Sequence, residues 1–119
     1  MSNILIADAN GRRRVQTEAI AQTSGNHTYS VGTLAEALRY AEIYIPEVLI
    51  LPDSLPDGNI ESVVGAFRSS QSALIRELPI VTGANAQSSG DHVFRARNNT
   101  AAALVVEAEN ALSNLGTAT

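Results

Sequence analysis

The chain has 119 residues and a formal net charge of −4. This length suits one domain, residues 1–119, that can bury most of its apolar surface in a single core. The negative charge argues against a nucleic-acid-binding surface, which needs a clustered positive face. We also expect a cytoplasmic protein without membrane contact, because no apolar run approaches the roughly 20 residues of a transmembrane helix and no signal-peptide pattern follows Met1.

Cysteine and lysine are both missing from the sequence, and each absence excludes a kind of chemistry. There is no cysteine, which excludes disulfides and thiolate metal sites. All eight basic residues are arginine, so no lysine ammonium is available to a reaction or a binding site. His27 and His92 lack the spacing of metal ligands, and we assign neither a catalytic role.

The first part of the chain predicts a strand followed by a helix. Asn3–Ala7 is a short apolar run, typical of a buried strand. A helix is predicted over residues 10–24, with Asn10 as its N-cap and Gly25 as its stop signal. We expect its inward side to hold Val15, Ala19 and Ile20. The triplet Arg12–Arg14 opposes the helix dipole in the first turn, so we expect a nearby carboxylate to offset it.

Residues 28–51 repeat this order of elements. Thr28–Val31 is β-prone, and Thr33 is an N-cap with Glu36 at the capping-box position. The apolar stripe of the following helix is made by Leu34, Ala37, Leu38 and Ala41. Val48–Leu51 is an unbroken apolar run between prolines, which is typical of a central parallel strand buried on both faces.

An acidic loop follows this central strand. Pro52–Gly58 consists of turn formers and holds the carboxylates of Asp53 and Asp57. The next residues have the helical spacing i, i+3, i+4, i+7, and their apolar face holds Ile60, Val63, Val64 and Phe67. A loop between a buried parallel strand and its helix lies at the carboxyl edge of the sheet, where open α/β proteins keep their sites.

The last third of the chain predicts two more strands and a final helix. Leu78–Thr82 follows the polar stretch Ser69–Ser72, His92–Arg95 is a weaker strand, and Thr100 can cap the last helix. The inner side of that helix holds Leu104, Val105, Ala108, Ala111, Leu112 and Leu115. Only nine residues, Gly83–Asp91, separate the two strands. A parallel crossover usually takes a dozen or more, so we expect the fourth helix to be shortened or absent.

Strands and helices thus alternate along the chain without an internal repeat or a linker. This pattern predicts a single doubly wound α/β domain with a mostly parallel sheet.

Five motifs together resemble the receiver domain of two-component response regulators. They are Ile4–Asp8, Val31–Leu38, Pro46–Leu51, Leu55–Gly58 and Leu78–Val81, in the order and at nearly the spacing of that family. The resemblance implies a flavodoxin-like fold with a five-stranded parallel sheet in the order 2-1-3-4-5. It also implies an aspartate after the third strand that accepts a phosphoryl group, and Mg²⁺ held by two acidic residues after the first strand. A Thr or Ser would end the fourth strand and a Lys the fifth.

Carried over to this chain, the first two parts of that phosphorylation site are changed. Asp8 matches one acidic position after the first strand, but the second position is Ala9. The acceptor position, counted from Pro46 and Pro56, falls on Pro52. A carboxylate follows one residue later, at Asp53. Asp8 alone, or Asp8 with Asp53, could hold Mg²⁺ only weakly.

The remaining two positions are changed as well. The hydroxyl position falls on Ala84, or on Thr82 if the fourth strand is shorter, and the lysine position falls near Arg97. Phosphoryl transfer depends on neutralising charge through a divalent ion and a fixed cation. Arginine is no simple substitute for lysine, because its planar guanidinium prefers two-pronged pairing.

These changes lead to the hypothesis of a degenerate receiver, or pseudo-receiver. We expect it to act in signal transduction by binding a protein partner, with a homodimer as one candidate, and without Asp phosphorylation, cofactor or enzymatic activity. One alternative is an active receiver phosphorylated on Asp53, with Mg²⁺ bound by Asp8 and Asp53. Another is a small flavodoxin-like ligand-binding domain.

Several of these residues also have plain structural interpretations. Asp8 can pair with the arginine triplet instead of a metal, Asp53 can be a turn residue, and Asp57 is expected to serve turn formation before the third helix. Thr82 can simply end its strand. Arg97 is either a permanent internal cation at the acidic edge or an exposed arginine on the last loop, and the sequence leaves both open.

Overall fold

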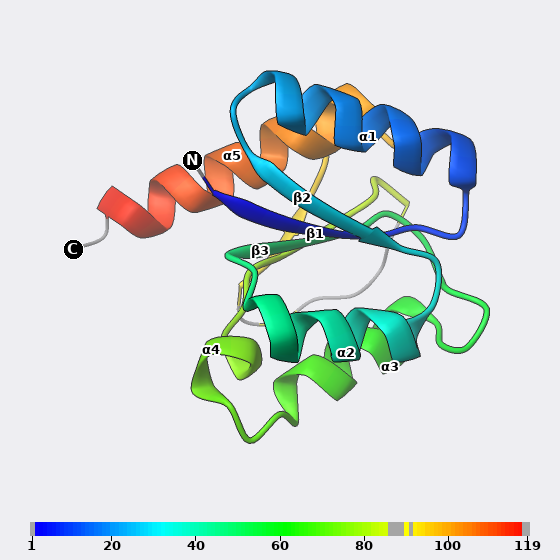
Figure 1. The fold of residues 1–119 in the computed structure, drawn as a ribbon, viewed down its shortest axis with the longest axis vertical. Helices are drawn as coiled ribbons and strands as arrows, with labels where there is room; N and C mark the ends of the chain where they lie inside the picture. The colour runs from blue at the N-terminus through cyan, green and yellow to red at the C-terminus, as the bar shows by residue number, and fades with distance from the viewer. Residues whose placement is uncertain (1, 86–89, 91, 118–119) are drawn as a thin grey trace.

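The structure, a computed structural model, describes residues 2–85, 90 and 92–117, with side chains up to residue 113. In this part of the chain, the strands form one parallel sheet in the order β2-β1-β3-β4-β5 (Figure 1). Their bounds are β1 Asn3–Ala7, β2 His27–Val31, β3 Val48–Leu51, β4 Ile80–Thr82 and β5 Val93–Arg95. The strand order and direction confirm the predicted doubly wound, flavodoxin-like α/β fold.

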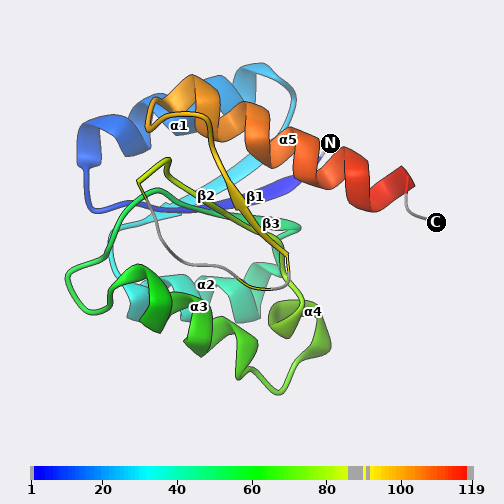
Figure 2. The ribbon, with the colours of Figure 1, turned by 180° about the vertical axis from the view of Figure 1, so that it is seen from behind.

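Helices cover both faces of the sheet. Their bounds are α1 Gly11–Thr23, α2 Leu34–Tyr44, α3 Ile60–Arg68, α4 Ala73–Arg76 and α5 Ala101–Thr117. Helices α1 and α5 lie side by side on one face, and α2, α3 and α4 lie on the other (Figures 1 and 2). None of the helices in the described part of the chain has the length and apolarity that a membrane crossing requires.

The central strand β3 is buried on both faces, as its sequence predicts. Successive side chains of a strand point to opposite faces. Val48 and Ile50 pack with residues of α1 and α5, whereas Leu49 and Leu51 pack with residues of α2 and α3. The unbroken apolar run therefore supplies both halves of the core.

The predicted helix caps are present. The side-chain oxygens of Asn10, Thr33 and Thr100 each accept a hydrogen bond from a backbone N–H three residues later. The predicted apolar faces of α2 and α5 also pack into the core, with Ala37, Ala41, Leu104, Val105, Ala108 and Ala111 buried. The predicted inward residue Leu115 lies outside the described side chains.

The predicted inner face of α1 is wrong in part. Val15 is 64% exposed and Ala19 is exposed, whereas Thr17 and Ala21 are buried and Ile20 is partly buried. Apolar spacing counts threonine as a polar residue and therefore does not predict that Thr17 is buried. The Thr17 hydroxyl donates to the Arg13 carbonyl at 2.7 Å, so its only strongly polar group is satisfied and the side chain can be buried.

The fourth helix in chain order lies where none was predicted. Helix α4 follows the polar stretch Ser69–Ser72 and precedes β4. Between β4 and β5, where the shortened or absent helix was expected, the described residues 83–85, 90 and 92 are not helical. Residues 86–89 and 91 of that segment lie outside the described residues.

Candidate functional site

The predicted site residues gather at the carboxyl edge of the sheet, where β1, β3 and β4 end. Asp8 follows β1, Pro52 and Asp53 follow β3, and Thr82 ends β4, two residues before Ala84. The strand order reverses between β1 and β3, so these ends form the topological switch point of the fold. Sites of open α/β proteins lie in this place.

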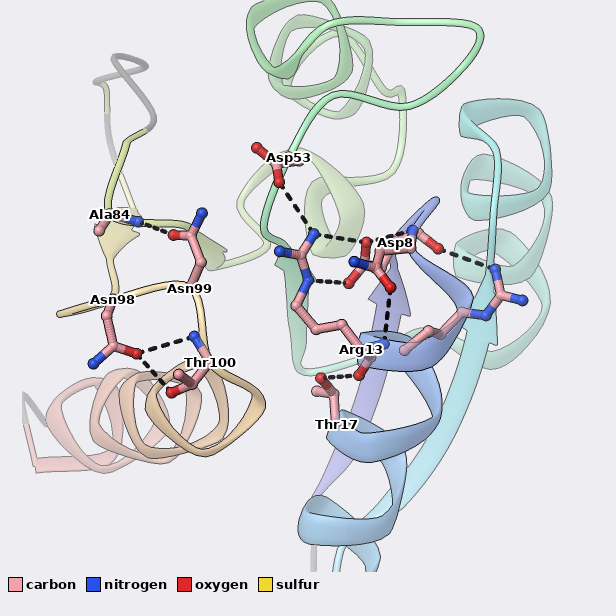
Figure 3. A network of polar contacts seen from close by, with 10 residues as sticks. Asp8, Arg13, Thr17, Asp53, Ala84, Asn98, Asn99 and Thr100 are labelled. Atoms are coloured by element: carbon pink, nitrogen blue, oxygen red, sulfur yellow. Dashed lines mark hydrogen bonds and ion pairs between the residues drawn. The ribbon is translucent and has the colours of Figure 1, made fainter.

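The best-connected group at this edge is the pair of Asp8 and Arg13 (Figure 3). The Asp8 side chain is only 1% exposed. Arg13 approaches it with two prongs, as Nε donates to Oδ2 at 2.6 Å and Nη2 donates to Oδ1 at 2.9 Å. The Asn10 backbone N–H also donates to Oδ1, at 2.9 Å. Both carboxylate oxygens are therefore used within the protein, in the strong charge-assisted geometry.

The same guanidinium also reaches Asp53. Nη2 of Arg13 donates to Oδ2 of Asp53 at 3.1 Å, although the Asp53 side chain is 57% exposed. Arg13 therefore lies between the two carboxylates that follow β1 and β3 (Figure 3). Hydrogen bonding to Asp8, with a smaller contribution from Asp53, raises the pKa of Arg13 above its usual value against the opposing effect of burial. The cation is permanent.

Local structure explains why Arg13 arrives at this place. Asn10 fixes the start of α1, because its Oδ1 accepts the backbone N–H of Arg13 at 3.1 Å. The next residue, Arg14, also turns back and donates to the Asp8 carbonyl at 3.0 Å. Arg12 is exposed. These contacts confirm that a carboxylate offsets the arginine triplet at the positive end of the helix.

The end of β3 is packed closely against the end of β4. Pro52 is buried, and its carbonyl accepts the Gly83 N–H at 3.2 Å. A Cβ atom at Gly83 would lie 2.5 Å from the Pro52 carbonyl oxygen and 2.5 Å from Oδ1 of Asn99. Only glycine allows this approach of backbone to backbone.

An asparagine that sequence reasoning missed joins β4 to the loop before α5. Oδ1 of Asn99 accepts the backbone N–H of Ala84 at 2.7 Å (Figure 3). Thr82 is fully buried, and its hydroxyl is 3.4 Å from the Phe94 carbonyl, to which it donates. The hydroxyl of Thr82 is thus engaged with the neighbouring strand β5. The contact of Asn99 was missed because the polar run Asn98–Thr100 signals a helix cap and gives no indication that Asn99 binds Ala84 across the sheet edge.

Asp57 has a longer-range role than the expected turn formation. Its carboxylate accepts the backbone N–H groups of Leu34 at 2.7 Å and Ala35 at 3.1 Å, at the start of α2. These two hydrogen bonds, the one from Leu34 first, lower the pKa of Asp57. The acidic loop is therefore tied to α1 through Asp53, to α2 through Asp57 and to β4 through Pro52.

The comparisons agree with this geometry at the level of the fold. No protein-family model matches the sequence, and no curated protein matches it either. Solved structures do match. The receiver domain of the sensor histidine kinase PA1611 from Pseudomonas aeruginosa, whose structure holds a magnesium ion in its active-site cleft, is 21% identical with a TM-score of 0.77, over 94% of this chain and 98% of that one. The chemotaxis response regulator CheY4 of Vibrio cholerae is 18% identical with a TM-score of 0.78, over 93% of this chain and 98% of that one.

A response regulator receiver domain protein from Clostridium thermocellum matches over 100% of both chains, with 17% identity and a TM-score of 0.75. The chain has the receiver fold. These identities are low, so the likeness carries the fold and leaves the chemistry to the residues of the site.

The residues present at this edge of the receiver fold do not fit a magnesium ion. Mg²⁺ requires oxygen ligands in near-octahedral geometry. Both Asp8 oxygens are already held by Arg13 and Asn10, and Ala9 and Pro52 offer no side-chain ligand. No group of three or more metal-ligating side chains occurs among the described residues.

Arg97, at the position expected for the lysine of the receiver fold, lies on the surface. It is exposed and lines a shallow cavity of about 400 Å³ together with Thr100 and Val106 of the α5 region. Within the described part of the chain, no ion pair joins it to a carboxylate. The cation that joins the two carboxylates of the acidic edge is Arg13. Of the two alternatives for Arg97, the structure shows the exposed arginine on the last loop.

Proposed function

We propose that the chain is a receiver-like signalling module that binds a protein partner and does so without phosphorylation of an aspartate. The observation that carries this proposal is the position of the Arg13 guanidinium between Asp8 and Asp53. In a phosphorylation site of the receiver type, a divalent ion and a fixed cation neutralise the phosphoryl oxygens. In this chain a side-chain cation already neutralises the carboxylates, so one conformation of the edge is favoured permanently.

The lack of an acceptor in the usual place supports the same proposal. The residue directly after β3 is Pro52, whose side chain cannot accept a phosphoryl group, and its carbonyl is hydrogen-bonded to Gly83. Asp53 is exposed but shares its carboxylate with Arg13. A module of this kind needs no cofactor and is not an enzyme. The net charge of −4 fits a protein partner better than nucleic acid or an anionic membrane surface.

The competing function is an active receiver that uses Asp53. Its exposed side chain is the observation in its favour, because a small phosphodonor could reach it. It requires Arg13 to leave both carboxylates. Mg²⁺ would then have to replace the three hydrogen bonds that Arg13 donates to the two carboxylates, because a buried Asp8 carboxylate without a cation is costly.

Phosphorylation by a small-molecule donor separates the two functions. The protein is incubated with acetyl phosphate and magnesium, and its intact mass is measured together with that of a receiver domain that retains the complete site. We expect the adduct on the reference protein alone. A base-labile adduct on this chain that disappears in the Asp53→Asn variant would establish the active receiver and overturn the proposal.

A further inference from the structure

A second feature lies at the opposite, amino edge of the sheet. An open cavity of about 460 Å³ is formed between the α2–β3 turn, α4 and α5. Figures 1 and 2 show α4 at this end of the molecule, beside the start of β3 and far from the loops that hold Asp8 and Asp53. Its apolar lining includes Ile45, Pro46, Leu74, Leu78, Pro79 and Leu112. We call it the amino-edge groove.

Ile45 in this groove has an unfavourable backbone conformation. It ends α2 with φ 45° and ψ 77°, in the left-handed region. Glycine and asparagine are usual at such helix ends, whereas a β-branched residue there is an outlier with an energetic cost. Burial in the core does not offset this cost, because the side chain is 45% exposed. The strained residue instead presents its sec-butyl side chain to the groove.

Leu74 faces the same groove from α4. Leu74 is 65% exposed. Helix α4 is only four residues long, and its buried residue Ile75 anchors it to the core. Two large apolar side chains, Ile45 and Leu74, are thus held at the groove by short or strained backbone segments. Apolar groups that remain exposed around a cavity, with polar groups at its rim, are typical of a protein-binding surface.

The rim of the amino-edge groove is negatively charged. Glu47 and Glu77 line it, and none of its described lining residues is basic. Neither carboxylate takes part in an ion pair among the described residues. Oε1 of Glu47 accepts the backbone N–H of Asn3 at 3.2 Å, which leaves its other oxygen free for a partner. Uncompensated carboxylates beside an apolar groove are complementary to a basic and apolar ligand.

We propose that the amino-edge groove binds a peptide segment of another protein in which an apolar side chain is flanked by arginine or lysine. Glu47 and Glu77 would pair with the basic groups, and the apolar side chain would lie between Ile45 and Leu74. A second copy of this chain fits less well, since two chains of net charge −4 repel each other. The proposal rests on the proposed function in one respect, namely that the chain acts through a protein partner. It does not depend on Arg13.

The test uses a synthetic amphipathic helix with leucines on one face and arginines beside them. Two matched peptides carry glutamate in place of arginine or serine in place of leucine. Amide NMR spectra of the chain are recorded during titration with each peptide. We expect shifts that cluster on residues 45–47 and 73–77 with the first peptide and none with the other two. Shifts confined to another surface, or equal shifts with the serine peptide, would overturn the proposal.

Variants assign the binding to the groove. Ile45→Gly relieves the strain and removes the apolar group, so we expect equal or greater thermal stability with an affinity about 10-fold lower, as for loss of an interface anchor. Leu74→Ser should weaken binding similarly. The double variant Glu47→Gln/Glu77→Gln should lower affinity about 3- to 10-fold at low salt and flatten its salt dependence.

Val106→Ser and Glu107→Gln, which lie on α5 at another cavity and do not line the amino-edge groove, are the matched controls and should leave affinity unchanged. Unchanged affinity in both Ile45→Gly and Leu74→Ser would overturn the proposal. So would shifts of the groove residues that depend on protein concentration without peptide, because a second copy would then be the occupant. Both readouts are independent of the acetyl phosphate assay, so failure here and failure of the proposed function are distinguishable.

Discussion

Replacement of Arg13 by methionine tests the role of the buried ion pair directly. The substitution keeps most of the aliphatic volume but removes the two hydrogen bonds to Asp8 and the one to Asp53. The Asp8 carboxylate, in a side chain that is 1% exposed, would keep only the hydrogen bond from the Asn10 backbone N–H. Loss of one partner from a fully buried pair costs about 3–5 kcal/mol.

The expected loss in this chain is somewhat smaller. The Arg13 side chain is 14% exposed, so water can reach the vacated space and solvate part of the Asp8 charge. We therefore expect the free energy of unfolding to fall by about 2–4 kcal/mol. For a domain of 119 residues, this corresponds to a fall in Tm of roughly 8–16 °C.

Urea unfolding followed by far-UV circular dichroism measures this loss. Arg12→Met is the matched control, since Arg12 is exposed on the same turn of α1, and it should change stability by no more than about 0.5 kcal/mol. In a double-mutant cycle, Arg13→Met with Asp8→Asn should cost about 1–3 kcal/mol less than the sum of the single variants. Additive effects, or equal losses in Arg12→Met and Arg13→Met, would show that the ion pair of Arg13 with Asp8 does not carry this stability.

Two further predictions concern the loops around this pair. Hydrogen bonds from α2 lower the pKa of Asp57 in the folded protein. The stabilisation by the Asp57 carboxylate is therefore present above the unperturbed pKa of 3.8, and it is lost as pH falls through the lower pKa of the folded protein. Thermal unfolding should therefore show Asp57→Asn less stable than the native chain at neutral pH, with the difference shrinking below about pH 4; a difference that grows on acidification would contradict this. Gly83→Ala should destabilise the fold by about 1–3 kcal/mol in urea unfolding, because its Cβ would lie 2.5 Å from the Pro52 carbonyl oxygen. Gly65→Ala, whose Cβ meets nothing within 4 Å on helix α3, should instead stabilise by about 0.5–1 kcal/mol; equal effects of the two substitutions would rule out crowding at Gly83 as the cause.

The sequence predicts the fold of this chain well because the decisive signals are local. The unbroken run Val48–Leu51 is buried on both faces, as its composition indicates. The caps at Asn10 and Thr33 depend on residues only three positions apart. Periodicity was less reliable on α1, where the exposed Val15 and the buried Thr17 reverse the simple rule, because one internal hydrogen bond allows threonine to be buried.

The site was predictable in some of its residues, such as Asp8 and Asp53, but not in Arg13 or Asn99 or in the connections among them. The sequence predicts that Asp8 and Asp53 lie at one edge of the sheet and that a carboxylate lies near the arginine triplet. It could not tell that Arg13, rather than its neighbours, spans both carboxylates, since three successive helical residues point in three directions. The contacts of Asp57 with α2 and of Asn99 with Ala84 join residues far apart in the sequence. Such contacts leave no local pattern.

We propose that the Arg13 guanidinium takes the place of the magnesium-dependent switch that a phosphorylated receiver uses. Amide NMR spectra of the native chain with beryllofluoride and magnesium test it most directly, because this mixture mimics a phosphorylated aspartate. We expect the signals of Asp8, Arg13 and Asp53 to keep their positions. Saturable shifts that cluster on these residues and require both magnesium and beryllofluoride would contradict the account.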